Sequence, residues 1–148
     1  MAISQAMCTL FKKDLLLGDH HLDTDDIRIA LYTSSASLSA ATEGYTTSNE
    51  ITNSSGSAYT AGGKQLTSVT VTENSTSGVF DAADPEWTSA TFTANGALIY
   101  NKTLGDASSN SRGAIAVLAF GGDFTVSGGT FKIVFPAATA SNAIVRID

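Results

Sequence analysis

Apolar and polar positions at the start of the chain follow a helical period. Four apolar side chains recur at the i, i+4, i+7, i+8 spacing that lines one face of a helix: Ile3, Met7, Leu10 and Phe11. Ser4 fits an N-cap and Gly18 a helix stop. The pattern predicts a helix over residues 4–17, within an N-terminal arm (residues 1–26) that packs on the rest of the chain.

From residue 27 onward the period shortens to that of strands. Runs of β-branched residues alternate with clusters of Gly, Asn, Asp and Ser, which is the usual strand signal. Strands are predicted at 27–33, 66–72, 78–82, 88–93, 96–101, 113–120, 124–127, 130–135 and 143–147. Residues 113–120 are apolar on both faces of the predicted strand, as in a central strand of a sheet. We therefore expect residues 27–148 to form an all-β domain, an antiparallel β-sandwich of about eight strands with either jelly-roll or immunoglobulin-like topology.

Glycine dipeptides predict two tight hairpins. Asn95-Gly96 and Gly128-Gly129 both supply the positive φ values that two-residue turns need. The first turn would separate strands 88–93 and 96–101, and the second would separate strands 124–127 and 130–135.

Two stretches do not fit the strand rhythm. Residues 34–64 are rich in Ser, Thr, Ala and Gly, and the Thr47/Glu50 spacing predicts one helical turn near 47–52. Such a long loop is either functional or interface-forming, or it is a surface excursion held in place by its tyrosines, Tyr45 and Tyr59, and both interpretations stay open. Residues 103–112 are predicted to be the most flexible loop.

Composition narrows the classes of function. The chain has 148 residues, with 8 basic and 14 acidic side chains and a net charge of −6, which argues against nucleic-acid binding. No apolar run approaches the roughly 18 residues of a membrane helix, so no membrane partner is expected. The N-terminus lacks the pattern of a secretory signal, and one cysteine excludes an internal disulfide, so we expect synthesis in a cytoplasm, where the thiol stays reduced.

Candidate catalytic and metal-binding residues do not assemble into a recognisable site. Ala58–Gln65 resembles a phosphate-binding loop but has Gln65 where Ser or Thr should hold magnesium, so a glycine turn into a strand is expected. The remaining candidates are expected to be a packed thiol, two histidines in a solvated turn and solubilising carboxylates: Cys8, His20, His21, Asp81, Asp84, Glu86 and Asp123. Trp87 is expected to be a partly buried core aromatic at a strand start. We thus expect that the chain is not an enzyme and that it binds no cofactor and no metal.

Several short stretches carry a resemblance as a set. They are residues 29–35 (IALYTSS), 45–50 (YTTSNE), 59–63 (YTAGG), Trp87, 96–101 (GALIYN) and 135–138 (FPAA). In this order the chain resembles small structural proteins of tailed-bacteriophage virions, and in particular capsid decoration (cement) proteins. The resemblance implies a non-enzymatic homo-oligomer, often a trimer, that is synthesised in a host cytoplasm, sits on the outer surface of the virion head and binds the major capsid protein.

Two other roles remain open under the same resemblance. One is a tail- or fibre-associated module that binds host glycans, and the other is a head–tail or tail component. Seven residues are candidate interface contacts: Ile3, Met7, Leu10, Phe11, Tyr45, Tyr59 and Trp87.

Overall fold

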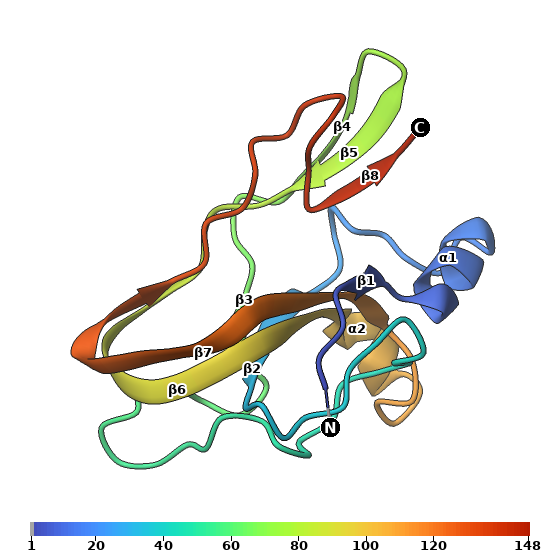
Figure 1. Ribbon diagram of the computed structural model, residues 1–148. Helices are drawn as coiled ribbons and strands as arrows, with labels where there is room; N and C mark the ends of the chain where they lie inside the picture. Colours follow the sequence, from blue (N-terminus) through green and yellow to red (C-terminus); the bar gives the residue numbers. More distant parts are fainter. Residues whose placement is uncertain (1) are drawn as a thin grey trace.

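The structure is a computed structural model that describes residues 2–148 (Figure 1). It contains eight strands and two short helices. In chain order these are β1 (Ala6–Met7), α1 (Thr9–Leu16), β2 (Ile27–Tyr32), β3 (Lys64–Gln65), β4 (Thr70–Asn74), β5 (Ser77–Asp81), β6 (Glu86–Asn101), α2 (Lys102–Asp106), β7 (Ala114–Lys132) and β8 (Val145–Ile147).

The strands form two antiparallel sheets, which confirms the predicted all-β sandwich class. The larger sheet has the order β1-β7-β6-β2-β3 and the smaller sheet the order β4-β5-β8. This order is not the ABED/CFG arrangement of an immunoglobulin domain. Figure 1 shows the small sheet on one side of the large sheet, with α1 at the end where β6 and β7 are joined through α2.

A single long pair, β6 with β7, replaces five of the predicted strands and both predicted hairpins. Asn95-Gly96 is not a turn, because β6 runs through it and Gly96 pairs with Tyr32 on one side and Ala119 on the other. A Cβ at Gly96 would lie 2.6 Å from the Leu118 carbonyl oxygen, so glycine is needed here for close packing.

The second predicted turn, at Gly128-Gly129, is a β-bulge within β7. Ala90 pairs with Gly129 and Thr91 with Ser127, which leaves Gly128 unpaired at φ +65°. A wider bulge occurs earlier in β7, at residues 120–123. Beyond Val117, no described strand pairs with the second edge of β7.

The predicted N-terminal helix is only half right. Residues 4–8 are not helical, because Ala6 and Met7 pair with β7 as strand β1 and tertiary pairing overrides the local helical spacing. The N-cap is Cys8 rather than Ser4, and it makes no side-chain cap bond. The predicted stop is confirmed, since Gly18 has φ +78° and donates its N–H to the Leu15 carbonyl at 3.1 Å.

The long loop over residues 34–63 is fixed by a buried carboxylate. Glu50 does not cap a helical turn as predicted. Its Oε1 accepts hydrogen bonds from the Tyr59 hydroxyl (2.5 Å) and the Gly62 N–H (2.7 Å), and its Oε2 accepts from the Tyr45 hydroxyl (2.6 Å). Tyr45 also stacks on Tyr100, with ring centroids 4.9 Å apart. The loop is therefore held by its tyrosines against the larger sheet.

One hydrophobic core joins both sheets and α1. It includes Phe11 of α1, Ile99 of β6 and Phe80 and Val145 of the smaller sheet. The segment predicted as the most flexible loop, 103–112, begins inside α2 instead, because the Asn101 side chain accepts from the Leu104 N–H and caps this helix. The division into an arm (1–26) and a domain (27–148) stays a prediction.

Candidate functional site

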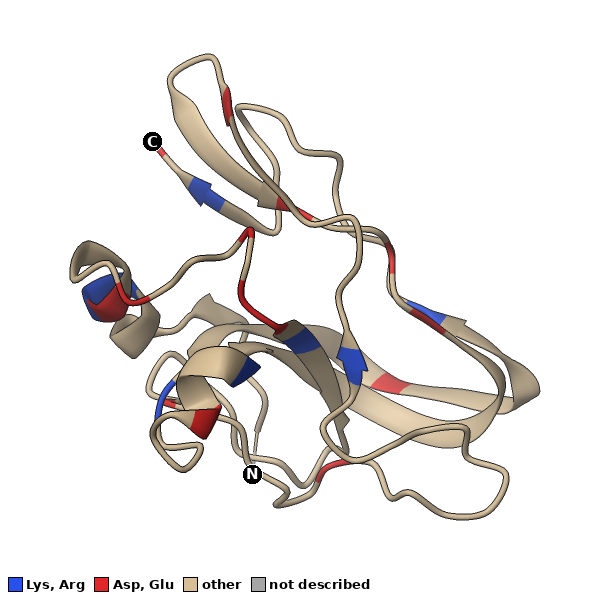
Figure 2. Cartoon of the chain, turned by 180° about the vertical axis from the view of Figure 1, so that it is seen from behind, with Lys and Arg blue, Asp and Glu red and all other residues tan. Residues whose placement is uncertain are grey.

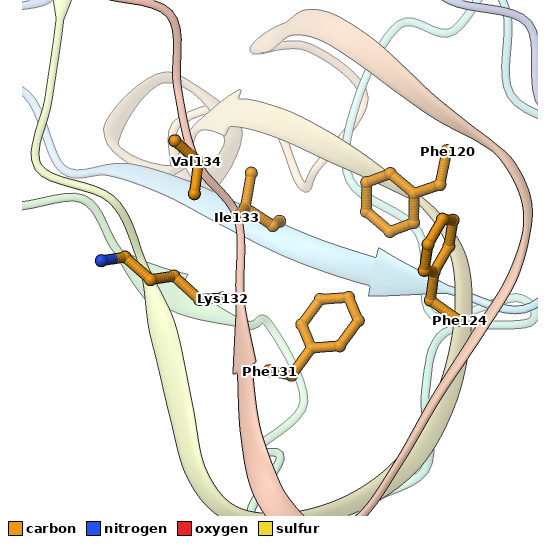
Figure 3. A pocket seen from close by; sticks show the side chains of 6 residues that line it. All are labelled: Phe120, Phe124, Phe131, Lys132, Ile133 and Val134. Atoms are coloured by element: carbon orange, nitrogen blue, oxygen red, sulfur yellow. The ribbon is translucent and has the colours of Figure 1, made fainter.

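An apolar cavity opens on the outer part of β7 (Figure 3). We call it the β7 pocket; its volume is about 260 Å³, and it is lined by Phe120, Phe124, Phe131, Lys132, Ile133 and Val134. Two of the apolar side chains are strongly exposed, Phe124 at 53% and Val134 at 73%. In Figure 3 the three phenyl rings converge on the cavity while the Lys132 amine points away. Exposed apolar side chains grouped in this way make the pocket a candidate contact surface.

The wide bulge in β7 creates the pocket. Ala119 pairs with Gly96 and Phe124 with Ala94, so residues 120–123 stand opposite Asn95 alone. The Asn95 amide donates to Asp123 Oδ1 at 2.8 Å and ties the bulge to β6. Gly121 has φ +80°, a backbone conformation that glycine adopts easily, and this allows the bulge to form. The bulge brings Phe120 and Phe124 together, with ring centroids 6.1 Å apart.

Aromatic contacts connect this pocket to the core. Phe131 lies 6.1 Å from Phe120, 5.1 Å from Phe92 and 6.1 Å from Trp87, measured between ring centroids. Phe92 and Trp87 are buried. Aromatic pairs at these separations stabilise the packing, so the pocket is connected to the buried core through ring contacts.

A second apolar surface lies between α1 and the smaller sheet. A cavity of about 120 Å³ there is lined by Phe11, Leu15, Leu22, Val71, Gly78, Val79, Phe80, Val145 and Ile147. Leu16 (90% exposed) and Leu17 project into solvent at the end of α1. We call this surface the α1 notch.

The structure divides the seven predicted interface residues into two groups. Phe11, Tyr59 and Trp87 are buried in the core, so their side chains pack within the chain. The prediction that Trp87 is a core aromatic at a strand start is confirmed, since it is the second residue of β6. The other four are Ile3, Met7, Leu10 and Tyr45, all partly buried; their role as contacts stays a prediction.

Sequence reasoning missed the residues of the β7 pocket. It assigned Phe120, Phe124 and Phe131 to three separate short strands. The available signal was the glycine pair Gly121-Gly122, flanked by phenylalanines, since isolated glycines in a strand pattern often mark a bulge.

The catalytic and metal candidates do not converge. Cys8 is fully buried, as expected for a packed thiol, and burial raises its pKa to about 11. His21 is exposed, but His20 is buried, so the predicted solvated turn is wrong for His20. Among residues 2–148, no three His, Cys, Asp or Glu side chains are grouped so as to hold a metal ion.

Charges are distributed thinly over the molecule. Figure 2 shows Lys, Arg, Asp and Glu scattered over both sheets and the loops. Several of the basic residues are paired with nearby carboxylates, as Arg112 is with Asp14 (2.9 Å) and Asp19 (2.5 Å). No helix in the described chain has the length and apolar character needed to cross a membrane.

Comparison with known proteins adds no relative: no family model, no curated protein and no solved structure matches this chain.

Proposed function

We propose that this chain is a structural protein of a bacteriophage virion that binds the outer surface of the head shell as a decoration, or cement, protein. The observation that carries the proposal is the β7 pocket, an exposed apolar surface fixed to the core by packed aromatic rings. The virion assignment rests on the sequence resemblance. The partner is the major capsid protein, and the chain acts by binding and not by chemistry.

The physical properties of the chain suit this role. A net charge of −6 repels packaged DNA and favours a place on the outside of the shell. A lattice of identical sites multiplies modest contacts through avidity, so one small apolar surface per copy can suffice.

Binding to empty shells tests the proposal directly. Purified protein should co-sediment with shells assembled from the major capsid protein alone and raise their resistance to heat. Phe124→Asp should weaken binding by at least about tenfold, because a central apolar contact is often worth about 2 kcal/mol or more. Thr72→Asp is the control, since Thr72 is exposed on the smaller sheet and lines neither the β7 pocket nor the α1 notch. Absence of wild-type binding would contradict the proposal, and equal loss in both variants would contradict the choice of surface.

The expected trimer has its own test. The α1 notch is the surface that we assign to contacts between copies, because it places exposed leucines beside an apolar cavity. Light scattering on the purified protein gives the mass, and Leu16→Asp should lower it to that of the protomer. A wild-type protein that is monomeric at all concentrations would remove the homotrimer from the proposal.

The alternative roles have weaker support. A glycan-binding module needs exposed aromatic faces, but Trp87 and Tyr59 are buried and Tyr45 is stacked on Tyr100. A head–tail or tail component usually needs long extended arms. Locating the protein on particles by electron microscopy separates these roles from decoration of the head.

A further inference from the structure

The two adjacent histidines lie in opposite environments. His21 is exposed, whereas His20 is 7% exposed and lies edge-on against Phe11, with ring centroids 4.9 Å apart. His20 thereby joins α1 to the end of β6, where its Nδ1 lies 3.2 Å from the Asn101 amide nitrogen.

The orientation of the Asn101 side chain is fixed by two other bonds. Its Oδ1 accepts from the Leu104 N–H at 3.1 Å, which caps α2, and its Nδ2 donates to Asp25 Oδ2 at 2.6 Å. Asn101 therefore presents an N–H to His20, so Nδ1 of His20 must be the acceptor. The proton of neutral His20 is then on Nε2, which is buried and has no hydrogen-bond partner.

A second proton on His20 is poorly accommodated. It would go to Nδ1, where the ring N–H would face the N–H of Asn101. Turning the amide over would remove both the α2 cap and the bond to Asp25. Protonated His20 would therefore have two buried donors and no acceptor, which is costly at this depth.

The charged groups around His20 come from each segment that packs against it. Asp14 lies on α1, Asp19 and Asp25 lie in the turn, and Arg112 precedes β7. Arg112 already bonds Asp14 and Asp19, so their charge is largely compensated. Burial is the largest influence and lowers the pKa of His20, although the three carboxylates oppose it.

We propose that His20 is an acid-sensitive latch whose protonation releases α1 and the following turn, residues 17–26, from the end of β6. The docked segment requires the neutral ring, and the released segment does not. Release also opens the buried site of Cys8, the N-cap of α1.

The direction of the pH dependence follows from linkage. The pKa of His20 is lowered when the segment is docked and ordinary, near 6.5, when it is released. The released form therefore binds the extra proton more tightly, and its population rises as pH falls below about 6.5. One proton per opening gives at most about a tenfold increase per pH unit.

The single cysteine reports the release. The rate of Cys8 modification by 4,4′-dithiodipyridine is measured between about pH 8 and pH 5, the range in which histidines titrate. Dividing by the rate for glutathione at each pH removes the intrinsic titration of a thiol. The normalised rate should rise as pH falls in the wild type and in His21→Gln, the matched control. It should stay flat in His20→Gln, which cannot take up a proton but can still accept from Asn101.

Measurements on the wild type keep the test decisive if His20→Gln does not fold. An NMR titration gives the pKa of the His20 ring, which should lie below the ordinary histidine value near 6.5. The latch is overturned by a flat normalised rate in the wild type, by an undiminished rise in folded His20→Gln, or by a His20 pKa at or above that ordinary value.

Discussion

The two halves of the β6–β7 pair use the same two strands in different surroundings. In the inner half, residues 96–101 with 114–119, β2 and β1 pair along the outer edges, and most side chains on both faces are buried. In the outer half, residues 86–94 with 124–132, β6 alternates between buried and exposed positions and β7 is largely exposed.

The difference teaches how this chain presents a binding surface. The inner half is fixed by neighbours on every side and supplies the stability. The outer half continues the same hydrogen-bonded ladder beyond the ends of β1 and β2 and places Phe124 in solvent. The inner half thus stabilises the fold, and the outer half presents the binding surface. We expect substitutions in the inner half to lower stability and substitutions in the outer half to weaken binding.

The largest contrast is expected between Leu98→Ala and Phe124→Ala. Leu98 is fully buried in the inner half, so its truncation should lower the free energy of unfolding by about 2–5 kcal/mol. Phe124 is half exposed, so its truncation should cost less than about 1 kcal/mol. Urea denaturation followed by circular dichroism measures both. Similar losses would show that the outer half is as much a part of the core as the inner half.

Alanine substitutions at two glycines, Gly96 in the inner half and Gly122 in the wide bulge of β7, compare how closely the backbone is packed at each. In Gly96→Ala the new Cβ would meet the Leu118 carbonyl oxygen at 2.6 Å and Ile3 Cδ1 at 2.8 Å, so we expect a loss of about 1–3 kcal/mol. Gly122→Ala meets nothing within 4 Å, so stability should change by no more than about 0.5 kcal/mol. Thermal unfolding of the two variants in parallel compares them. If Gly96→Ala left the thermal stability unchanged, this would contradict the close approach of β6 and β7.

The Glu50 network tests whether the long loop stabilises the inner half. Glu50→Gln leaves one acceptor oxygen for two tyrosine hydroxyls and the Gly62 N–H, so we expect a loss of about 1–3 kcal/mol. Glu50→Asp, which keeps the charge but shortens the reach, separates charge from geometry.

Alkaline unfolding gives a second measurement of this network. Burial and the Glu50 carboxylate raise the pKa of Tyr59 and of Tyr45 above the usual value near 10. The folded protein keeps protons that the unfolded chain gives up, so this stability is present below pH 10 and is lost as pH rises above it. Tyrosinate absorbance should therefore appear together with unfolding. Titration of all four tyrosines in the folded protein would contradict this coupling.

The smallest effect is expected at the bulge itself. Asn95→Ala removes the exposed hydrogen bond to Asp123 and should cost less than about 1 kcal/mol. Its consequence should be seen in binding to shells instead, because the bulge positions Phe120 and Phe124. A variant with unchanged shell binding would show that the pocket keeps its shape without this bond.

Local pattern was sufficient to predict the fold class and several strands. Residues 27–33 and 78–82 were placed within one residue of β2 and β5, since alternation and β-branched content are properties of the segment itself. Burial of Trp87 followed from residue type in the same way.

Features that depend on distant partners were not predicted. Ala6 and Met7 are strand residues only because β7 offers an edge to them. Asn95-Gly96 has the composition of a hairpin, but the neighbouring backbone of β7 requires glycine within a continuous strand. The β7 pocket needs four residues of β7 opposite Asn95 of β6. The register that pairs these two strands cannot be predicted from the sequence of either strand alone.

The two bulges in β7 beyond Val117, where its second edge is unpaired, have a consequence for crowded copies of this protein. An uninterrupted free strand edge is a template on which further chains add and grow into cross-β fibrils. In β7 the outward-facing N–H and C=O groups lose their regular spacing at residues 120–123 and again at Gly128. An incoming strand can therefore form only short ladders, which favours solubility even where many molecules are held side by side.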